Sequence, residues 1–449
     1  MKIKQFEDAP LAHYSYAIIS NEKMVVVDPA RNPLPYYQFA EENNAEIVGV
    51  LETHPHADFV SSHLQIHKET DATIYVSKMV GAEYPHQAFD DGDEFMFGNA
   101  TVKAIHTPGH SPDGITFYIT NSENDTKALF TGDTLFIGDV GRPDLREKAG
   151  NMKAKRQELA EAMYQTIQTK FTNLSDDVLV YPAHGAGSLC GKNMSDAASS
   201  TLGNERVGNW AFKKQTQEEF VNEILKDQPF IPSYFGFNVD INKKGATNFK
   251  SSISDLVVKL NINTIEKNSL IVDVRDQAEF KKAHFKGSYN IMARDSKDKI
   301  ETWLGSIIQP EEAFYLVVNS ISEIEEIISR IAKIGYEKQI KAVVSIGKNA
   351  NVVSTEPLDL KHFKSNLNDY KIIDIRNESE HKNEVKFEAS LNHPLNHLRT
   401  SAKEIAKDKP IVVHCAGGYR SAAGASILEA KLENAKVFDL STAIEDFNS

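Results

Sequence analysis

The sequence predicts a multidomain α/β protein, and three observations carry this prediction. Short apolar runs of strand length dominate about the first 120 residues, and a helical pattern follows further along the chain. A unit of strand, loop and helix occurs twice near the C-terminus, which favours parallel sheets. The 449 residues suffice for two to four domains, each with its own core.

Strand signals open the chain. Runs of β-branched and apolar residues bounded by turn residues predict strands at 24–27, 47–51, 73–76, 115–119, 128–130 and 178–181. Gly98 and Asn99 separate two further runs, 94–97 and 101–105, as a tight hairpin does.

Helical signals follow these strands. Apolar residues recur at every fourth position, as in an amphipathic helix: Leu159, Met163, Ile167 and Phe171. Thr216 and Glu219 have the spacing of a capping box, which predicts a helix through Leu225.

The C-terminal part contains an internal repeat. Residues 270–275 (Leu-Ile-Val-Asp-Val-Arg) match residues 371–376 (Lys-Ile-Ile-Asp-Ile-Arg). An acidic segment, a second apolar strand (314–318 or 410–413) and a helix follow in each copy. The Gly-, Asn- and Lys-rich stretch before the repeat predicts a linker. The expected domains are therefore 1–235, a linker at 236–250, 251–350 and 351–449.

Composition narrows the possible partners. The formal net charge of −13 argues against nucleic acid or an anionic membrane as a main partner. No apolar run approaches the roughly 20 residues of a membrane span, and the N-terminus lacks a secretory signal, so we expect a cytoplasmic protein. The only cysteines, Cys190 and Cys415, exclude a disulfide framework and favour a reducing compartment.

Metal-ligand side chains recur directly after predicted strands or in turns that contain glycine or proline. They form an ordered set: His54, His56, Asp58, His110, Asp133 and His184. In this order they resemble the metallo-β-lactamase superfamily across residues 1–235, which implies an αββα fold. Most members of that superfamily hold two metals and hydrolyse esters or amides.

Position 59 departs from this pattern. The superfamily places a ligand of the second metal there, whereas Phe59 has no lone pair to offer. Asp58 and His184 would then be incomplete ligands, which favours a mononuclear centre. Two histidines and one carboxylate on one face of a metal suit non-haem Fe(II) and O₂.

The individual motifs narrow the resemblance further. His-x-His-x-Asp, Thr-Pro-Gly-His, Gly-Asp-Thr-Leu-Phe, Gly-Arg-Pro-Asp and His-Gly-Ala-Gly-Ser resemble those of the persulfide dioxygenases. That resemblance implies oxidation of a low-molecular-weight persulfide, such as glutathione persulfide, by O₂ to sulfite and thiol. It implies one Fe²⁺ per chain on His54, His110 and Asp133, with His56, Asp58 and His184 behind these ligands. It also implies a homo-oligomer, a dimer or a tetramer.

Two residues near this set have open roles. Arg142 is a candidate anchor for a substrate carboxylate or sulfur oxyanion, because a guanidinium binds such groups in bidentate fashion. The alternative for Arg142 is a structural pair with Asp144. Cys190 lies six residues after His184 and is a candidate acceptor of sulfane sulfur; a buried inert thiol is the alternative.

A second reactive group lies at Cys415, between a strand and a helix. Gly417, Gly418 and Arg420 follow it, so backbone N–H groups can point at the sulfur and favour a thiolate or persulfide. A phosphatase loop would need five residues between cysteine and arginine, and here there are four. Residues 250–449 resemble two rhodanese-like sulfurtransferase domains, whose partners are thiosulfate, sulfite and thiols.

The first copy carries Asn319 and Ser320 where the second has Cys415, so we expect it to be inactive. The leading interpretation is a bifunctional persulfide dioxygenase and rhodanese. Two alternatives stay open: a glyoxalase-II-like thioester hydrolase with two zinc ions, and a non-catalytic sulfur carrier or redox sensor with a structural metal.

Overall fold

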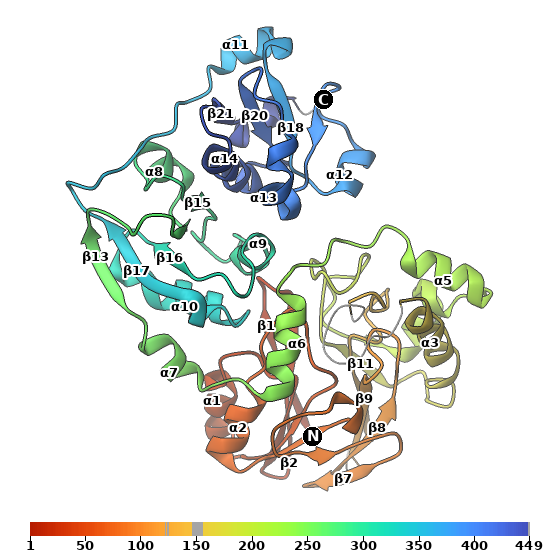
Figure 1. The fold of residues 1–449 in the computed structure, drawn as a ribbon. Helices are drawn as coiled ribbons and strands as arrows, with labels where there is room; N and C mark the ends of the chain where they lie inside the picture. Colours follow the sequence, from red (N-terminus) through yellow and green to blue (C-terminus); the bar gives the residue numbers. More distant parts are fainter. Residues whose placement is uncertain (122, 124, 146–155, 448–449) are drawn as a thin grey trace. The chain divides into compact units, whose positions relative to one another are not determined.

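The computed structural model describes residues 1–121, 123, 125–145 and 156–447 (Figure 1). The chain divides into two compact units. The first is Met1–Ser251 with Ala332–Gly335, and the second is Ser252–Ile331 with Tyr336–Ser449. Among the described residues, no helix has the length and apolar character needed to cross a membrane.

Two six-stranded mixed sheets build the first unit. The first sheet runs in sequence order: β1 (Lys2–Asp8), β2 (His13–Ser20), β3 (Lys23–Val27), β4 (Glu46–Leu51), β5 (Thr73–Val76) and β6 (Gln87–Ala88). The second sheet runs in the reverse order: β12 (Ser200–Thr201), β11 (Leu179–Pro182), β10 (Thr126–Gly132), β9 (Ile115–Asn121), β8 (Ala100–His106) and β7 (Glu94–Phe97). Phe97 pairs with Ala100, so Gly98 and Asn99 form the predicted hairpin.

Alternating side chains divide each sheet of this unit between two cores. Val25 and Phe130 face the core between the sheets, while their neighbours Val26 and Leu129 face helices. Helices α1 (Leu34–Glu42) and α2 (His63–Thr70) cover the first sheet, and α3 (Arg156–Thr169) and α5 (Gln217–Leu225) cover the second. The resulting αββα arrangement is the fold class predicted from the sequence. The remaining helices here are α4 (Leu202–Gly208), α6 (Phe235–Lys244) and α7 (Phe249–Ser254).

One helix of the first unit, α5, was predicted from its sequence, whereas another, α6, was not. The predicted capping box opens α5, because the Thr216 hydroxyl accepts from the Glu219 N–H at 3.2 Å and the Glu219 carboxylate accepts from the Thr216 N–H at 2.8 Å. The stretch interpreted as a linker instead forms most of α6. Its Asn242 is buried and donates to the carbonyls of His56 and Phe59, both at 2.8 Å. Asparagine here holds a neighbouring loop rather than forming a turn.

The second unit contains two parallel sheets, as the repeat predicts. The five-stranded sheet has the order β13 (Val258–Ile262), β17 (Ile340–Ile346), β16 (Phe314–Val317), β14 (Leu270–Asp273) and β15 (Tyr289–Asn290). The four-stranded sheet has the order β19 (Leu391–Asn392), β18 (Lys371–Asp374), β20 (Ile411–His414) and β21 (Val437–Asp439). The helices are α8 (Gln277–Lys282), α9 (Ile300–Ile307), α10 (Ile324–Ala332), α11 (Leu360–Ser365), α12 (Glu378–Asn383), α13 (Leu398–Ser401) and α14 (Tyr419–Lys431).

Candidate metal centre and thiol loop

Three predicted ligands converge at the ends of strands in the first unit. His54 follows β4, His110 lies between β8 and β9, and Asp133 follows β10 directly. Asp133 Oδ2 lies 3.8 Å from His54 Nε2 and 3.5 Å from His110 Nε2. All three side chains are buried, and their ligand atoms lie within 4.8 Å of one another.

The donor set fits a metal ion. Asp133 Oδ2 is buried and has no hydrogen-bond partner among the described residues, although it faces two imidazole nitrogens. A buried, unpartnered carboxylate oxygen is costly unless it binds a cation. Two histidines and one carboxylate leave further positions of such an ion open for substrates.

A threonine and an aspartate orient His54. Thr53 donates its hydroxyl proton to Asp28 Oδ2 at 2.8 Å, and its backbone N–H to Asp28 Oδ1 at 2.8 Å. The Thr53 hydroxyl lies 3.0 Å from His54 Nδ1, and its only proton is already used, so it accepts from Nδ1–H. The lone pair of Nε2 is then directed at the metal position, the usual arrangement behind a ligating histidine.

His184 contacts Asp133 on the side away from His54 and His110. Its Nδ1 is 2.7 Å from Asp133 Oδ1, and its Nε2 is 2.7 Å from Asp58 Oδ2. Burial alone would lower the pKa of His184, but Asp133 and Asp58 raise it well above its usual value. Burial alone would raise the pKa of Asp133, but His184 holds it well below its usual range. His184 therefore keeps Asp133 ionised with Oδ2 turned toward the metal position.

Rings pack closely around Phe59, beside a second group of candidate ligand side chains, His56, Asp133 and His184. Phe59 is 1% exposed, and its ring centroid lies 3.8 Å from that of His13 and 4.5 Å from that of His56. His56 Nε2 points at Asp28 Oδ1, 3.4 Å away. Burial lowers the pKa of His13 well below its usual value, and the neighbouring His184 and His56 lower it further, so His13 is a neutral partner here.

Sequence reasoning missed His13. It begins β2, far along the chain from every motif, and no ligand-type residue near it marks it as special. The isolated bridge between His13 and His184 brings it to the site.

Two glycines of the motifs are required by close packing. Gly132 has φ of +54°, and a Cβ there would lie 2.5 Å from the Thr53 hydroxyl oxygen. A Cβ on Gly141 would lie 1.8 Å from the Asp133 carbonyl oxygen. Glycine at both positions lets the loops that carry the ligands approach each other closely.

The side chain of Arg142 forms an ion pair with Asp144. Its Nε and Nη2 donate to the two carboxylate oxygens of Asp144 at 2.7 Å each, and its Nη1 donates to the Leu189 carbonyl at 3.2 Å. The side chain is 1% exposed, so this arrangement is the alternative that the sequence left open. A role as substrate anchor remains a prediction.

Cys190 lies beside the site, as its position after His184 predicted. It forms a group of buried metal-ligand side chains with Asp58 and His184. Burial raises the pKa of the Cys190 thiol well above its usual value, and Asp133 and Asp58 raise it further. A protonated thiol is a poor nucleophile, so these surroundings favour the inert alternative, while sulfur acceptance remains a prediction.

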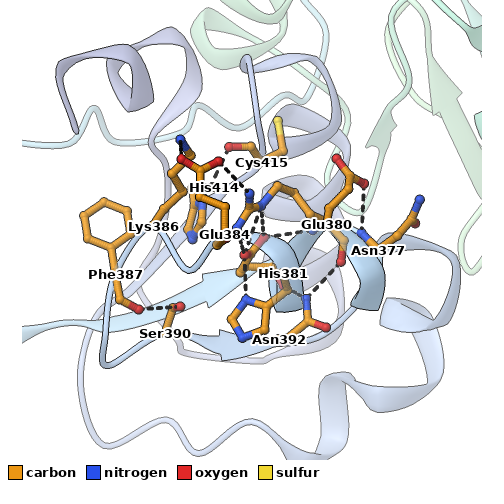
Figure 2. Close-up of polar contacts among 12 residues, drawn as sticks. Asn377, Glu380, His381, Glu384, Lys386, Phe387, Ser390, Asn392, His414 and Cys415 are labelled. Atoms are coloured by element: carbon orange, nitrogen blue, oxygen red, sulfur yellow. Dashed lines mark hydrogen bonds and ion pairs between the residues drawn. The ribbon is translucent and has the colours of Figure 1, made fainter. Parts of the chain in front are cut away.

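Cys415 has the expected loop geometry. It follows β20, it is 1% exposed, and the Gly418 N–H donates to its Sγ at 3.1 Å. Gly418 has φ of +94°, and a Cβ there would lie 2.8 Å from the Thr442 nitrogen, so glycine is needed. A Cβ on Gly417 would meet nothing within 4 Å, which leaves space over the loop. Figure 2 shows the sulfur beside a dense polar network.

Arg420, five residues after Cys415, contacts a carboxylate and an aromatic ring. It donates from Nη1 and Nη2 to the two carboxylate oxygens of Glu380, at 2.6 and 2.7 Å. Its guanidinium lies 5.8 Å from the ring centroid of Trp303, which belongs to the first repeat. The neighbouring Tyr419 hydroxyl also donates to the first repeat, at the Met292 carbonyl, 2.9 Å away. The repeat without a cysteine therefore supports the loop of the other.

Comparison with known proteins gives two families. Residues 8–184 match the Metallo-beta-lactamase superfamily, and residues 258–343 and 359–449 match the Rhodanese-like domain. A cytoplasmic hydroxyacylglutathione hydrolase of Arabidopsis thaliana is 29% identical over 49% of this chain and 83% of its own length. The mitochondrial persulfide dioxygenase of Bos taurus is 27% identical over 54% of this chain and 87% of its own length.

A solved structure extends the likeness beyond the first domain. The crystal structure of a metallo-beta-lactamase from Staphylococcus aureus subsp. aureus COL is 27% identical, with a TM-score of 0.67. The match covers 77% of this chain and 99% of that one. The chain thus joins an N-terminal domain of the metallo-β-lactamase superfamily to two rhodanese-like domains.

Proposed function

We propose that this protein is a bifunctional enzyme of sulfur metabolism. The first domain oxidises a low-molecular-weight persulfide with O₂ to sulfite and free thiol, using one Fe²⁺ per chain. The last domain carries sulfane sulfur on Cys415 between thiosulfate or sulfite and a thiol. The observation that carries this proposal is the convergence of His54, His110 and Asp133, with Phe59 in place of a second-site ligand.

The main alternative is a thioester hydrolase with two zinc ions. Hydroxyacylglutathione hydrolase and persulfide dioxygenase relatives match this chain at similar identity, so sequence likeness alone does not separate the two reactions. The packing favours the dioxygenase. Phe59 offers no metal ligand and packs against His13, while the group of His54, His110 and Asp133 suits Fe²⁺ and O₂.

In the first site, some residues would hold the metal and others orient those ligands. A bound Fe²⁺ would supply the redox chemistry that joins O₂ to a persulfide sulfur. His54, His110 and Asp133 would hold it on one face. Thr53 and His184 keep two of these ligands oriented through their hydrogen bonds.

The second site needs no metal. Cys415 attacks the sulfane sulfur of a donor, the sulfur–sulfur bond of the donor breaks, and the donor leaves with the electron pair of that bond. The Gly418 N–H already points at Sγ and stabilises negative charge on sulfur. Sulfite from the first site can accept that sulfur and leave as thiosulfate.

Metal analysis together with an oxygen electrode tests the first activity. We expect about one iron per chain, O₂ uptake with glutathione persulfide, and sulfite as product. Two zinc ions and thioester cleavage without O₂ uptake would establish the hydrolase instead.

A histidine substitution tests the non-catalytic alternative. We expect His110→Ala to give a folded, iron-poor protein without O₂ uptake, while His86→Ala, at an exposed position, keeps both iron and activity. A His110→Ala protein that is unfolded by circular dichroism would favour a structural metal.

A further inference from the structure

Charged side chains near Cys415 form ion pairs, and Figure 2 shows Glu380, Glu384 and Lys386 among them. Asp374 binds Arg376 through two nitrogens, Glu380 binds Arg420 in the same way, and Lys386 contacts Glu384. Three carboxylates thus face three cations. Burial lowers the pKa of the adjacent His414 to about 4, so this histidine adds no charge at neutral pH.

The pair between Glu380 and Arg420 is fixed from both sides. Glu380 also accepts from the Asn377 N–H at 3.1 Å, as part of the capping box of α12. Arg420 has a side chain only 15% exposed, with its guanidinium face on Trp303. Both terminal nitrogens of Arg420 (Nη1 and Nη2) donate to the carboxylate of Glu380, so an incoming anion must compete with Glu380 for this pair of donors, the fork of Arg420.

Both members of the pair are charged at neutral pH. Burial alone would raise the pKa of Glu380, but Arg420 holds it below its usual range. Arg420 is also close enough to Cys415 for their charges to interact. A cation that would attract an oxyanion to the sulfur is therefore present but neutralised by Glu380.

We infer that Glu380 determines the specificity of the sulfur-transfer site. By filling the fork of Arg420, it disfavours doubly charged oxyanions, thiosulfate and sulfite, relative to thiol persulfides. A persulfide carries at most one charge next to the sulfur that is transferred. This inference rests on the proposed sulfur transfer at Cys415 and names which substrates that site prefers.

The two half-reactions show where the preference acts. A Cys415 thiolate attacks the terminal sulfur of a thiol persulfide, the donor S–S bond breaks, and the thiol leaves as its thiolate. With thiosulfate the same S–S exchange releases sulfite instead, and neither exchange needs an outside oxidant or reductant. Thiosulfate cleavage and its reversal by sulfite share one transition state, so Glu380 disfavours both directions.

Donor selectivity of the full-length protein tests the inference. The kcat/KM values for thiosulfate and for glutathione persulfide are measured with cyanide as the common acceptor. We expect Glu380→Gln to raise kcat/KM for thiosulfate about tenfold or more, since Arg420 regains its net charge. The value for glutathione persulfide should stay within about twofold, because little charge changes at its reacting sulfur.

Glu384→Gln is the matched control. It removes one carboxylate from the same cluster but leaves the fork of Arg420 filled. We expect a much smaller rise in thiosulfate use than with Glu380→Gln. An equal rise would show that only the summed charge matters and would overturn the role of the pair.

Other outcomes separate this inference from the proposed function. Equal losses with both donors in Glu380→Gln would mean that Glu380 only positions Arg420, and the inference would fail. If the Gln variant does not fold, Glu380→Asp decides: its shorter carboxylate loosens the pair, so only thiosulfate use should rise, and parallel changes overturn the inference. No transfer by the unsubstituted protein with either donor would overturn the sulfurtransferase function itself.

Discussion

Asp133 shows how one carboxylate serves two tasks. Its Oδ1 is bound by His184, and its Oδ2 faces His54 and His110. The first contact fixes the direction of the second, so the ligand is oriented before a metal arrives. Thr53 and Asp28 do the same for His54.

Removal of the Thr53 hydroxyl should weaken metal binding. We expect Thr53→Val to lower metal affinity by about 10- to 100-fold, because His54 Nδ1 loses the acceptor that orients the ring. Competition with a chelator measures the affinity without reference to activity. Thr70→Val is the control, because the Thr70 hydroxyl donates to the Ile66 carbonyl and accepts from the Ala72 N–H, and neither residue belongs to the metal site. Unchanged affinity in Thr53→Val would remove Thr53 from the metal site.

His414 should make stability depend on pH. Burial lowers its pKa to about 4 in the folded protein, against about 6.5 when unfolded. Between these values only the unfolded state binds the proton, so stability is full at pH 7 and falls as the pH falls from 6.5 toward 4. From pH 7 to pH 5 we expect a loss of about 2 kcal/mol that is absent in His414→Asn. Urea unfolding at the two pH values measures this loss. An equal loss in the unsubstituted protein and in His414→Asn would contradict the prediction.

At the scale of elements, the two repeats share one hydrogen-bonded arrangement, here called the polar device. Asp273 binds Arg275 as Asp374 binds Arg376, directly after the first core strand of each copy. An asparagine, Asn290 or Asn392, then donates to two carbonyls of that turn at 2.9 and 3.0 Å. The device persists in the copy without a cysteine, so it serves the fold rather than the chemistry.

Removal of either asparagine should therefore cost similar stability. We expect Asn290→Ala and Asn392→Ala each to lower the free energy of unfolding by about 1–3 kcal/mol, because each removes one donor from two carbonyls of the turn. Urea unfolding followed by circular dichroism measures the loss, with the exposed Asn351→Ala as control. A neutral Asn290→Ala would show that the first repeat no longer depends on this device.

The elements could be predicted where their signal is local. The hairpin at Gly98, the capping box at Thr216 and the repeated strands follow from neighbouring residues, and the structure has all of them. Helix α6 could not, because its polar composition resembles a linker. Its Asn238 and Asn242 are buried against other parts of the fold, which composition does not reveal.

At the scale of the whole molecule, the two proposed sites lie in separate compact units. We expect Cys415→Ser to abolish sulfur transfer and keep O₂ uptake, and His110→Ala to do the reverse. Oxygen-electrode and thiocyanate assays on the same preparations measure both activities. Loss of both activities in either folded variant would show that the sites depend on each other.

The sequence by itself predicted the candidate ligands at strand ends, the two parallel-sheet domains and the cysteine loop, because a short run of residues carries the signal for each. Only the tertiary structure placed His13 beside Phe59, paired Arg142 with Asp144, and set Glu380 and Trp303 around Arg420. Except for Arg142 with Asp144, these contacts join residues far apart in the chain. Burial and packing, which select such partners, depend on the whole fold rather than on neighbouring residues.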